Sequence, residues 1–243
     1  MRGPRPAIAV AGACAVLAAC TTTVNGTSAR PLEARQPSLA RALDQVLPTN
    51  TELSTTLKSG PEGYLGQVVE GGADMLLQGV GPAQATPVDC VSATYRLQKF
   101  VYQTSPVQSV ASQSWAGGDV NGPSLSGFFG VVKLATADDA DAFFAASADK
   151  WRRCDGQTMV LHQPGADGLS RITDVAVDGR IVSAVVMQGA GRPVTVQRAL
   201  GVGANCIVDV EVSDVGGGKS GGDGAADAVA VAKLMLAKIA GAS

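Results

Sequence analysis

Five segments in the C-terminal half of the chain are rich in valine and isoleucine and are separated by short turn sequences such as PGADG, DG, GAGRP and GAN. Segments of this length and composition, joined by so few residues, are typical of antiparallel strands. The pattern therefore predicts a β-meander. Its expected strands are QTMVLHQ (157–163), LSRITDVAVD (169–178), RIVSAVVMQG (180–189), VTVQRALGVG (194–203) and NCIVDVEVS (205–213).

Two further strands and several helices are expected around this meander. The segments 106–117 and 125–135 are predicted strands joined by the turn GGDVNGPS. The clearest helix is 136–154, where Thr136 and Asp139 resemble a capping box. Glycine- and proline-rich stretches around 60–66 and 79–87 are predicted loops. The other expected helices are 38–47, 50–57, 89–103 and 225–240. Together these elements predict a single α+β domain with a central antiparallel sheet flanked by helices.

The N-terminus has the layout of a secretory signal peptide, in which the basic head MRGPRP precedes an uncharged apolar run. The run is shorter than the roughly 20 residues that a transmembrane helix needs. It ends in Leu17-Ala18-Ala19-Cys20, which resembles the bacterial lipobox, where the cysteine thiol is acylated and the chain is cut before it. An ordinary signal peptide with a chance cysteine is the alternative. The expected regions are a signal peptide at 1–19, a lipidated Cys20 with a flexible tether through residue 37, and a domain at 38–243.

Charge and composition exclude some classes of partner. The predicted signal peptide carries two of the 19 basic residues and no acidic residue, which leaves 17 basic against 21 acidic side chains in the remaining chain. A mildly acidic protein with scattered charge has no electrostatic basis for binding nucleic acid. The expected location is the extracytoplasmic face of the cell membrane, with the lipid anchor as the membrane contact.

The cysteines indicate one disulfide and one thiol. Cys14 leaves with the signal peptide and Cys20 takes the lipid, so that Cys90, Cys154 and Cys206 remain. An exported chain reaches an oxidising compartment, where two of these three are expected to pair. The chain has a single histidine and no CxxC sequence. We therefore expect no metal site and no cofactor.

Catalytic motifs are incomplete. Gly218-Lys219-Ser220 resembles the end of a phosphate-binding loop, but Ser213 stands where that motif needs glycine. The segment 122–127 has Ser126 at the last glycine position of GxSxG. His162 is the only histidine, and no nucleophile motif accompanies it. The chain is therefore predicted not to be an enzyme. An envelope hydrolase that uses His162 or paired aspartates, and a purely structural envelope module, are the alternatives.

Two segments resemble a known family. They are FFGVVKLATADDADAFFAASADKWRRCDG (128–156), with its Trp151-x-x-Cys154-x-Gly156 ending, and VQRALGVGANCIVDVEVS (196–213). Both are similar to the PknH-type extracellular sensor domain, found on a mycobacterial receptor kinase and on a set of mycobacterial lipoproteins. The resemblance is strongest over 85–240. It implies a central antiparallel sheet flanked by helices, with a cleft for an extracytoplasmic ligand.

The resemblance also implies the pairing of the cysteines. The first disulfide of the family maps onto Cys90 and Cys154, whereas the positions of its second hold Val196 and Ser213. Cys206 alternates with valines on an apolar strand face and is expected to be a buried free thiol. Bridges from Cys206 to either other cysteine are the competing arrangements.

The expected function is a membrane-anchored, non-catalytic, sensor-like domain that binds a ligand. The ligand is a small molecule, an envelope component or a protein. Polar side chains that would bind it if they converge in a cleft are Gln113, Trp115, Gln188 and Arg198.

Overall fold

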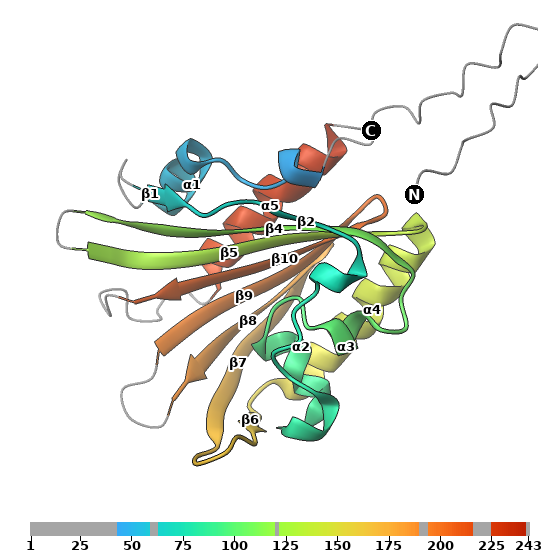
Figure 1. Ribbon diagram of the computed structural model, residues 1–243, viewed down its shortest axis with the longest axis vertical. Helices are drawn as coiled ribbons and strands as arrows, with labels where there is room; N and C mark the ends of the chain where they lie inside the picture. Colours follow the sequence, from blue (N-terminus) through green and yellow to red (C-terminus); the bar gives the residue numbers. More distant parts are fainter. Residues whose placement is uncertain (1–42, 59–62, 120–121, 190–193, 216–224, 242–243) are drawn as a thin grey trace, which may run out of the picture. The chain divides into compact units, whose positions relative to one another are not determined.

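The computed structural model describes residues 43–58, 63–119, 122–189, 194–215 and 225–241 (Figure 1). The predicted signal peptide, Cys20, the tether and the first part of the expected helix at 38–47 lie outside these residues. The described strands are β1 (Gly63–Leu65), β2 (Val69–Gly71), β3 (Ala85–Thr86), β4 (Val107–Asp119), β5 (Gly122–Leu134), β6 (Thr158–Leu161), β7 (Gly168–Asp178), β8 (Ile181–Gln188), β9 (Val194–Gly203) and β10 (Cys206–Asp214).

All ten strands join one antiparallel sheet in the order β1-β4-β5-β10-β9-β8-β7-β6-β3, with β2 also paired to β4. The predicted meander forms β6 to β10, and the predicted pair at 106–117 and 125–135 forms the β4–β5 hairpin. The two parts join where β10 pairs with β5. The short edge strands β1 and β3 lie in stretches predicted to be loops, because two or three residues are too few for a strand pattern.

The described helices are α1 (Asn50–Leu57), α2 (Val91–Thr94), α3 (Lys99–Tyr102), α4 (Ala137–Cys154) and α5 (Ala226–Ala240). The capping box of α4 is present: Asp139 N–H donates to Thr136 Oγ1 at 3.1 Å, and Thr136 N–H donates to Asp139 Oδ2 at 3.0 Å. None of the described helices combines the length and hydrophobicity needed to cross a membrane.

Two expected helices differ from the structure. The described part of 38–47 is a 3-10 turn at Leu43–Gln45. The expected helix at 89–103 is broken into α2 and α3, because Tyr95 has an extended backbone and Leu97 a left-handed one (φ 48°). A leucine in this conformation cannot continue a helix.

The helices α4 and α5 lie on opposite faces of the sheet, each over its own hydrophobic core (Figure 1). Strand alternation divides the side chains between the two faces. In β10, for example, Ile207 belongs to the core beneath α4, while Val208 and Val210 belong to the core beneath α5. We call these the α4 face and the α5 face. A sheet covered on both sides buries polar residues that sequence alternation would place in solvent.

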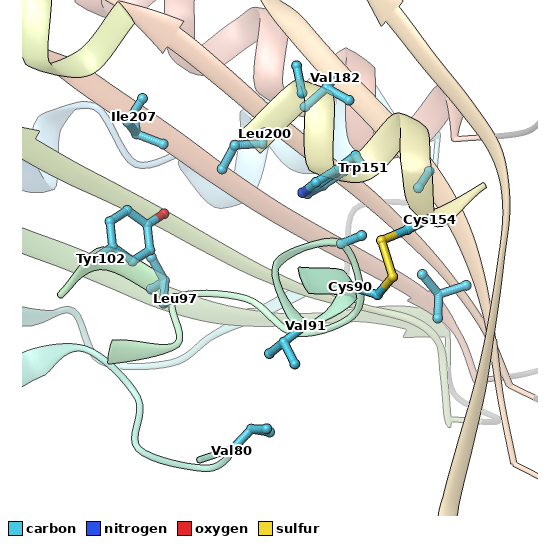
Figure 2. Packing of buried hydrophobic residues seen from close by; sticks show 14 of the residues in the cluster. Val80, Cys90, Val91, Leu97, Tyr102, Trp151, Cys154, Val182, Leu200 and Ile207 are labelled. Atoms are coloured by element: carbon cyan, nitrogen blue, oxygen red, sulfur yellow. A yellow bond between two sulfur atoms is a disulfide. The ribbon is translucent and has the colours of Figure 1, made fainter. Parts of the chain in front are cut away.

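One disulfide joins Cys90, just before α2, to Cys154, the last residue of α4, with a Cα–Cα distance of 5.6 Å (Figure 2). Cys206 is a buried free thiol in the core of the α5 face. Burial raises the pKa of this thiol, and the nearby Lys133 opposes the rise. Val196 and Ser213, to which the resemblance maps a second disulfide, face each other in the register of β9 and β10.

Peptide mapping of the non-reduced protein is expected to yield a linked pair containing Cys90 and Cys154, with Cys206 in an unlinked peptide. Replacing Cys90 and Cys154 together by Ala should lower the free energy of unfolding by roughly 4 kcal/mol, because their bridge closes a loop with a sequence separation of 64. The control, Cys206→Ser, should cost less because it only buries a hydroxyl in place of a thiol. A linked peptide containing Cys206 would contradict the assignment.

Candidate functional site

A groove runs along α4 on the side that faces residues 92–106. Its volume is about 280 Å³. The α4 residues that line it recur at spacings of three and four, so they form one stripe of the helix. The stripe extends from Asp139 to Lys150, which is about 16 Å along a helix that rises 1.5 Å per residue. The stripe is Asp139, Ala142, Phe143, Ala146, Ser147 and Lys150, and the opposite wall is Ser92, Val101, Thr104, Ser105 and Pro106.

Small side chains and one aromatic ring shape the helix wall. Ala142 and Ala146 are exposed and leave the middle of the groove open. Phe143 stacks on Tyr102 of α3, with ring centroids 4.5 Å apart and planes 15° from parallel. This stack packs the helix wall against the opposite wall.

A cluster of four charged side chains, two buried and two partly exposed, lies behind the groove on the α4 face. Arg198 of β9 is completely buried, and its Nη2 is 2.8 Å from Oδ1 of Asp209 in β10. Glu211 faces Arg198 in the strand register and also pairs with Arg96 at 2.6 Å. Two arginines and two carboxylates meet here, so the cluster has no formal net charge.

This cluster holds one wall of the groove on the sheet. The backbone N–H of Leu97 donates to Asp209 Oδ2 at 2.8 Å, and Arg198 Nη2 donates to the carbonyl of Ser92 at 3.4 Å. Trp151 of α4 also donates its indole N–H to Ser92 Oγ at 3.1 Å. The segment that contains the left-handed Leu97 is therefore fixed by side chains from β9, β10 and α4.

A small chamber of about 10 Å³ lies between the groove and the charged cluster, and it has room for one water-sized atom. Ser92, Val101, Phe143 and Ser147 line both the groove and the chamber. Tyr102 lies on the chamber, and its hydroxyl is buried without a hydrogen-bond partner in the part of the chain that the structure describes. Figure 2 shows the ring of Tyr102 beside Leu97 in the α4-face core.

The Tyr102 hydroxyl is a proton donor at neutral pH. Its burial raises the pKa well above the usual 10, and Asp209 raises it further, through its charge and as a nearby hydrogen-bond acceptor, whereas Arg198 opposes the rise. Asp209 also lines the chamber. The chamber therefore presents one hydroxyl donor and one carboxylate.

The structure does not bring the four predicted ligand-binding residues together. Trp115 and Gln113 lie on the α5 face, where Trp115 donates to Asn50 Oδ1 at 2.9 Å and Gln113 donates to the carbonyl of Gly66 at 2.9 Å. Gln188 follows the alternation of β8 to the α4 face, and Arg198 is buried there in the charged cluster. None of the four lines the groove. Arg198 contributes indirectly, through its bond to Ser92.

His162 lies in a chain of three polar groups at the edge of the sheet. Its Nε2 is 3.3 Å from Thr86 Oγ1, and its Nδ1 is 3.3 Å from Asp167 Oδ1. The order hydroxyl, imidazole, carboxylate matches that of a catalytic triad. However, both contacts are at the long end of hydrogen bonding, and the His162 and Asp167 side chains are about half exposed. Neither the groove nor the chamber contains any of the three residues. The contacts tie β3 to the β6–β7 turn.

Metal ligation has no candidate in the described ranges. No group of three or more histidine, cysteine, aspartate or glutamate side chains is placed there to hold an ion.

The groove residues of α4 were not among the predicted site residues. The helical pattern at 136–154 marks an apolar stripe that includes Phe143 and Ser147. Ala142 and Ala146 have no functional group that would mark a binding site. The opposite wall comes from a segment that is distant in the sequence. Only the exposed alanines beside that stripe could have indicated a second contact surface.

Comparison with known proteins agrees with this architecture. The family model for the PknH-like extracellular domain matches residues 39–238. The chain belongs to this family. The solved extracellular domain of PknH from Mycobacterium tuberculosis is similar over 82% of this chain and 94% of that chain, with a TM-score of 0.68 and 21% sequence identity. This similarity establishes the fold, and the predicted α+β architecture is confirmed.

The serine/threonine-protein kinase PknH of Mycobacterium bovis is 26% identical over 206 residues, which cover 83% of this chain and 33% of the kinase. PknH of M. tuberculosis is 25% identical over 182 residues, which cover 74% of this chain and 28% of the kinase. The chain thus spans about a third of the length of these relatives. The similarity concerns an extracellular domain of a kinase.

Replacing Asp209 by Asn should lower the free energy of unfolding by about 3 kcal/mol, because it leaves Arg198 buried without its closest charged partner. Asp141→Asn is the matched control, because Asp141 pairs with Arg180 at 2.7 Å on the surface, where the loss should stay below about 1 kcal/mol. Urea unfolding followed by circular dichroism measures both. Equal losses would contradict the importance of the buried pair.

Proposed function

We propose that the chain is a lipid-anchored extracytoplasmic domain of the sensor type, which binds a ligand in the groove between α4 and residues 92–106 without transforming it. The observation that carries this proposal is the groove of about 280 Å³ with a small polar chamber, lined by the Tyr102 side chain and Asp209, directly behind it. A concave site with a few polar groups around an apolar surface is the usual form of a small-molecule site. Buried hydroxyls are normally hydrogen-bonded, and a polar group of a ligand that reached the chamber could bond to this one.

Both walls of the groove are fixed before any ligand binds. The disulfide ties the end of α4 to the residue before α2, at the Lys150 end of the groove. The bond from Leu97 to Asp209 holds the opposite wall on the sheet. A prearranged site loses less conformational entropy on binding, which supports recognition by a groove of modest size.

Membrane attachment is proposed from the sequence around Cys20. The family membership supports an extracytoplasmic location for the domain. The kinase activity of the PknH relatives is not part of the proposal, because the similarity covers about a third of those proteins. Information about the bound state would have to pass to a protein partner.

The two alternatives make different demands on the structure. An envelope hydrolase would need the exposed Thr86–His162–Asp167 chain to work without an enclosed substrate site. A purely structural module would not need a groove with a polar chamber behind it. The groove therefore favours ligand binding.

Replacing Cys20 by Ala should move the protein from the membrane fraction to the soluble fraction, because the thiol that would carry the lipid is removed. Cell fractionation and intact mass determination measure this. Replacing the buried Cys206 by Ala is the control and should leave fractionation unchanged. Full membrane retention of the Cys20→Ala variant, with the wild-type mature mass, would refute the anchor.

Filling the groove should abolish ligand binding. Ala146→Trp places a large side chain in the middle of the groove. Ala145→Trp adds the same side chain at the preceding position of α4, which is exposed but does not line the groove. We expect envelope extracts to shift the backbone amide NMR signals of groove residues in the wild type and in Ala145→Trp, and not in Ala146→Trp. Identical shifts in all three proteins, or none in the wild type, would contradict the proposed site.

A further inference from the structure

We infer that the ligand of this groove is a neutral carbohydrate, bound as a short oligosaccharide with one hydroxyl directed into the chamber beside Tyr102. The inference rests on the proposed function, since it names the class of ligand for the same groove. Three independent properties of the site support it: the balance of charge, the pairing of hydroxyls with an aromatic ring, and the chemistry of the chamber.

The charges around the groove favour a ligand without net charge. Its ends carry one carboxylate, Asp139, and one ammonium, Lys150, about 16 Å apart along α4. Lys150 lies 3.6 Å from Asp89, and Asp139 uses Oδ2 for the helix cap. The charged cluster behind the groove balances two arginines against two carboxylates. Among the described residues that line the groove, no cluster of like charges marks a phosphate or carboxylate site, which normally uses convergent arginines or lysines.

The lining of the groove combines hydroxyl groups with one aromatic surface. Four of its eleven residues are serine or threonine, and these can both donate and accept hydrogen bonds. Phe143 offers its partly exposed ring, while Tyr102 stacks on it from the protein side. Sugar rings carry hydroxyls around the rim and patches of C–H groups on their faces, and this combination matches a wall of hydroxyls beside an aromatic ring.

The chamber discriminates between functional groups. It has space for about one water-sized atom, a donor in the Tyr102 hydroxyl and an acceptor in Asp209. An alcohol oxygen can accept from Tyr102 and donate to Asp209. A carboxylate oxygen cannot donate and would be repelled by Asp209, and an ammonium group cannot accept from Tyr102. The chamber therefore suits a hydroxyl of the ligand.

The shape of the groove indicates more than one sugar ring. The stripe of α4 that lines it is about 16 Å long, and the exposed alanines at 142 and 146 leave its middle shallow and open. An extended chain of linked rings would contact Phe143 in the middle and the charged side chains at both ends. The chamber adjoins the groove beside Phe143, because Phe143 and Ser147 line both spaces.

The test uses saturation-transfer NMR on the full chain with neutral trisaccharides of glucose, galactose, mannose and arabinose. Triglycine and a lysophospholipid serve as probes of other ligand classes. We expect transfer to the ring C–H protons of at least one trisaccharide, and no transfer in the groove-filled Ala146→Trp variant. Replacing the neutral sugar by its uronic acid form should weaken binding, because that form is negatively charged.

Tyr102→Phe tests the chamber directly. It removes one oxygen and keeps the ring that stacks on Phe143. We expect sugar affinity to fall about five- to tenfold through loss of one hydrogen bond. Tyr64→Phe is the matched control, because Tyr64 is 75% exposed on β1 and does not line the groove, and its affinity should equal that of the wild type.

The outcomes separate the inference from the function on which it rests. Absence of transfer to every trisaccharide overturns the carbohydrate inference, and groove shifts with triglycine or the lysophospholipid would then keep the groove as a binding site for another class. Wild-type sugar affinity in Tyr102→Phe overturns the role of the chamber. Sugar binding that persists unchanged in Ala146→Trp places the sugar elsewhere and overturns the inference as well.

Discussion

The ion pair between Arg198 and Asp209 is the interaction on which the groove depends. Both side chains are withdrawn from water, which costs several kcal/mol for each ion unless other groups satisfy them. Asp209 accepts from the backbone N–H of Leu97, and Arg198 donates to the carbonyls of Ser92 and Val210. A buried ion pair adds little net stability over an apolar replacement. We therefore interpret the pair as an interaction that fixes the position of the segment containing Leu97.

The left-handed backbone of Leu97 is the main structural consequence of this interaction. A left-handed leucine costs roughly 1–2 kcal/mol relative to the usual helical conformation. It persists because its N–H reaches Asp209 and its side chain fills the space above Gly130, where a Cβ atom would lie 2.6 Å from Leu97 Cδ1. The break it makes between α2 and α3 turns the chain so that residues 101–106 can face α4. A continuous helix over 89–103 would not provide this wall.

Local patterns in the sequence predicted the elements better than the site. Alternation and turns identified the meander, and the cap at Thr136 identified α4, because these signals are confined to neighbouring residues. The charged cluster depends on register: the short connection through Ala204 and Asn205 places Arg198 opposite Glu211. That register could have been counted from the turn. The groove could not have been predicted in this way, because its two walls come from separate segments that meet only after the sheet has formed. The pairing of the strands also explains why Trp115 and Arg198, both predicted for one cleft, lie on opposite faces of the sheet.

The groove walls do not depend on a second disulfide between β9 and β10. Val196 and Ser213 are opposite each other on β9 and β10, two residues beyond the pair of Arg198 and Glu211. A bridge there would brace two strands that already share a continuous ladder from Cys206 to Asp214. The groove walls are joined instead by the bond between Cys90 and Cys154 and by Asp209. The disulfide therefore joins the two walls, whereas a backbone ladder holds β9 on β10.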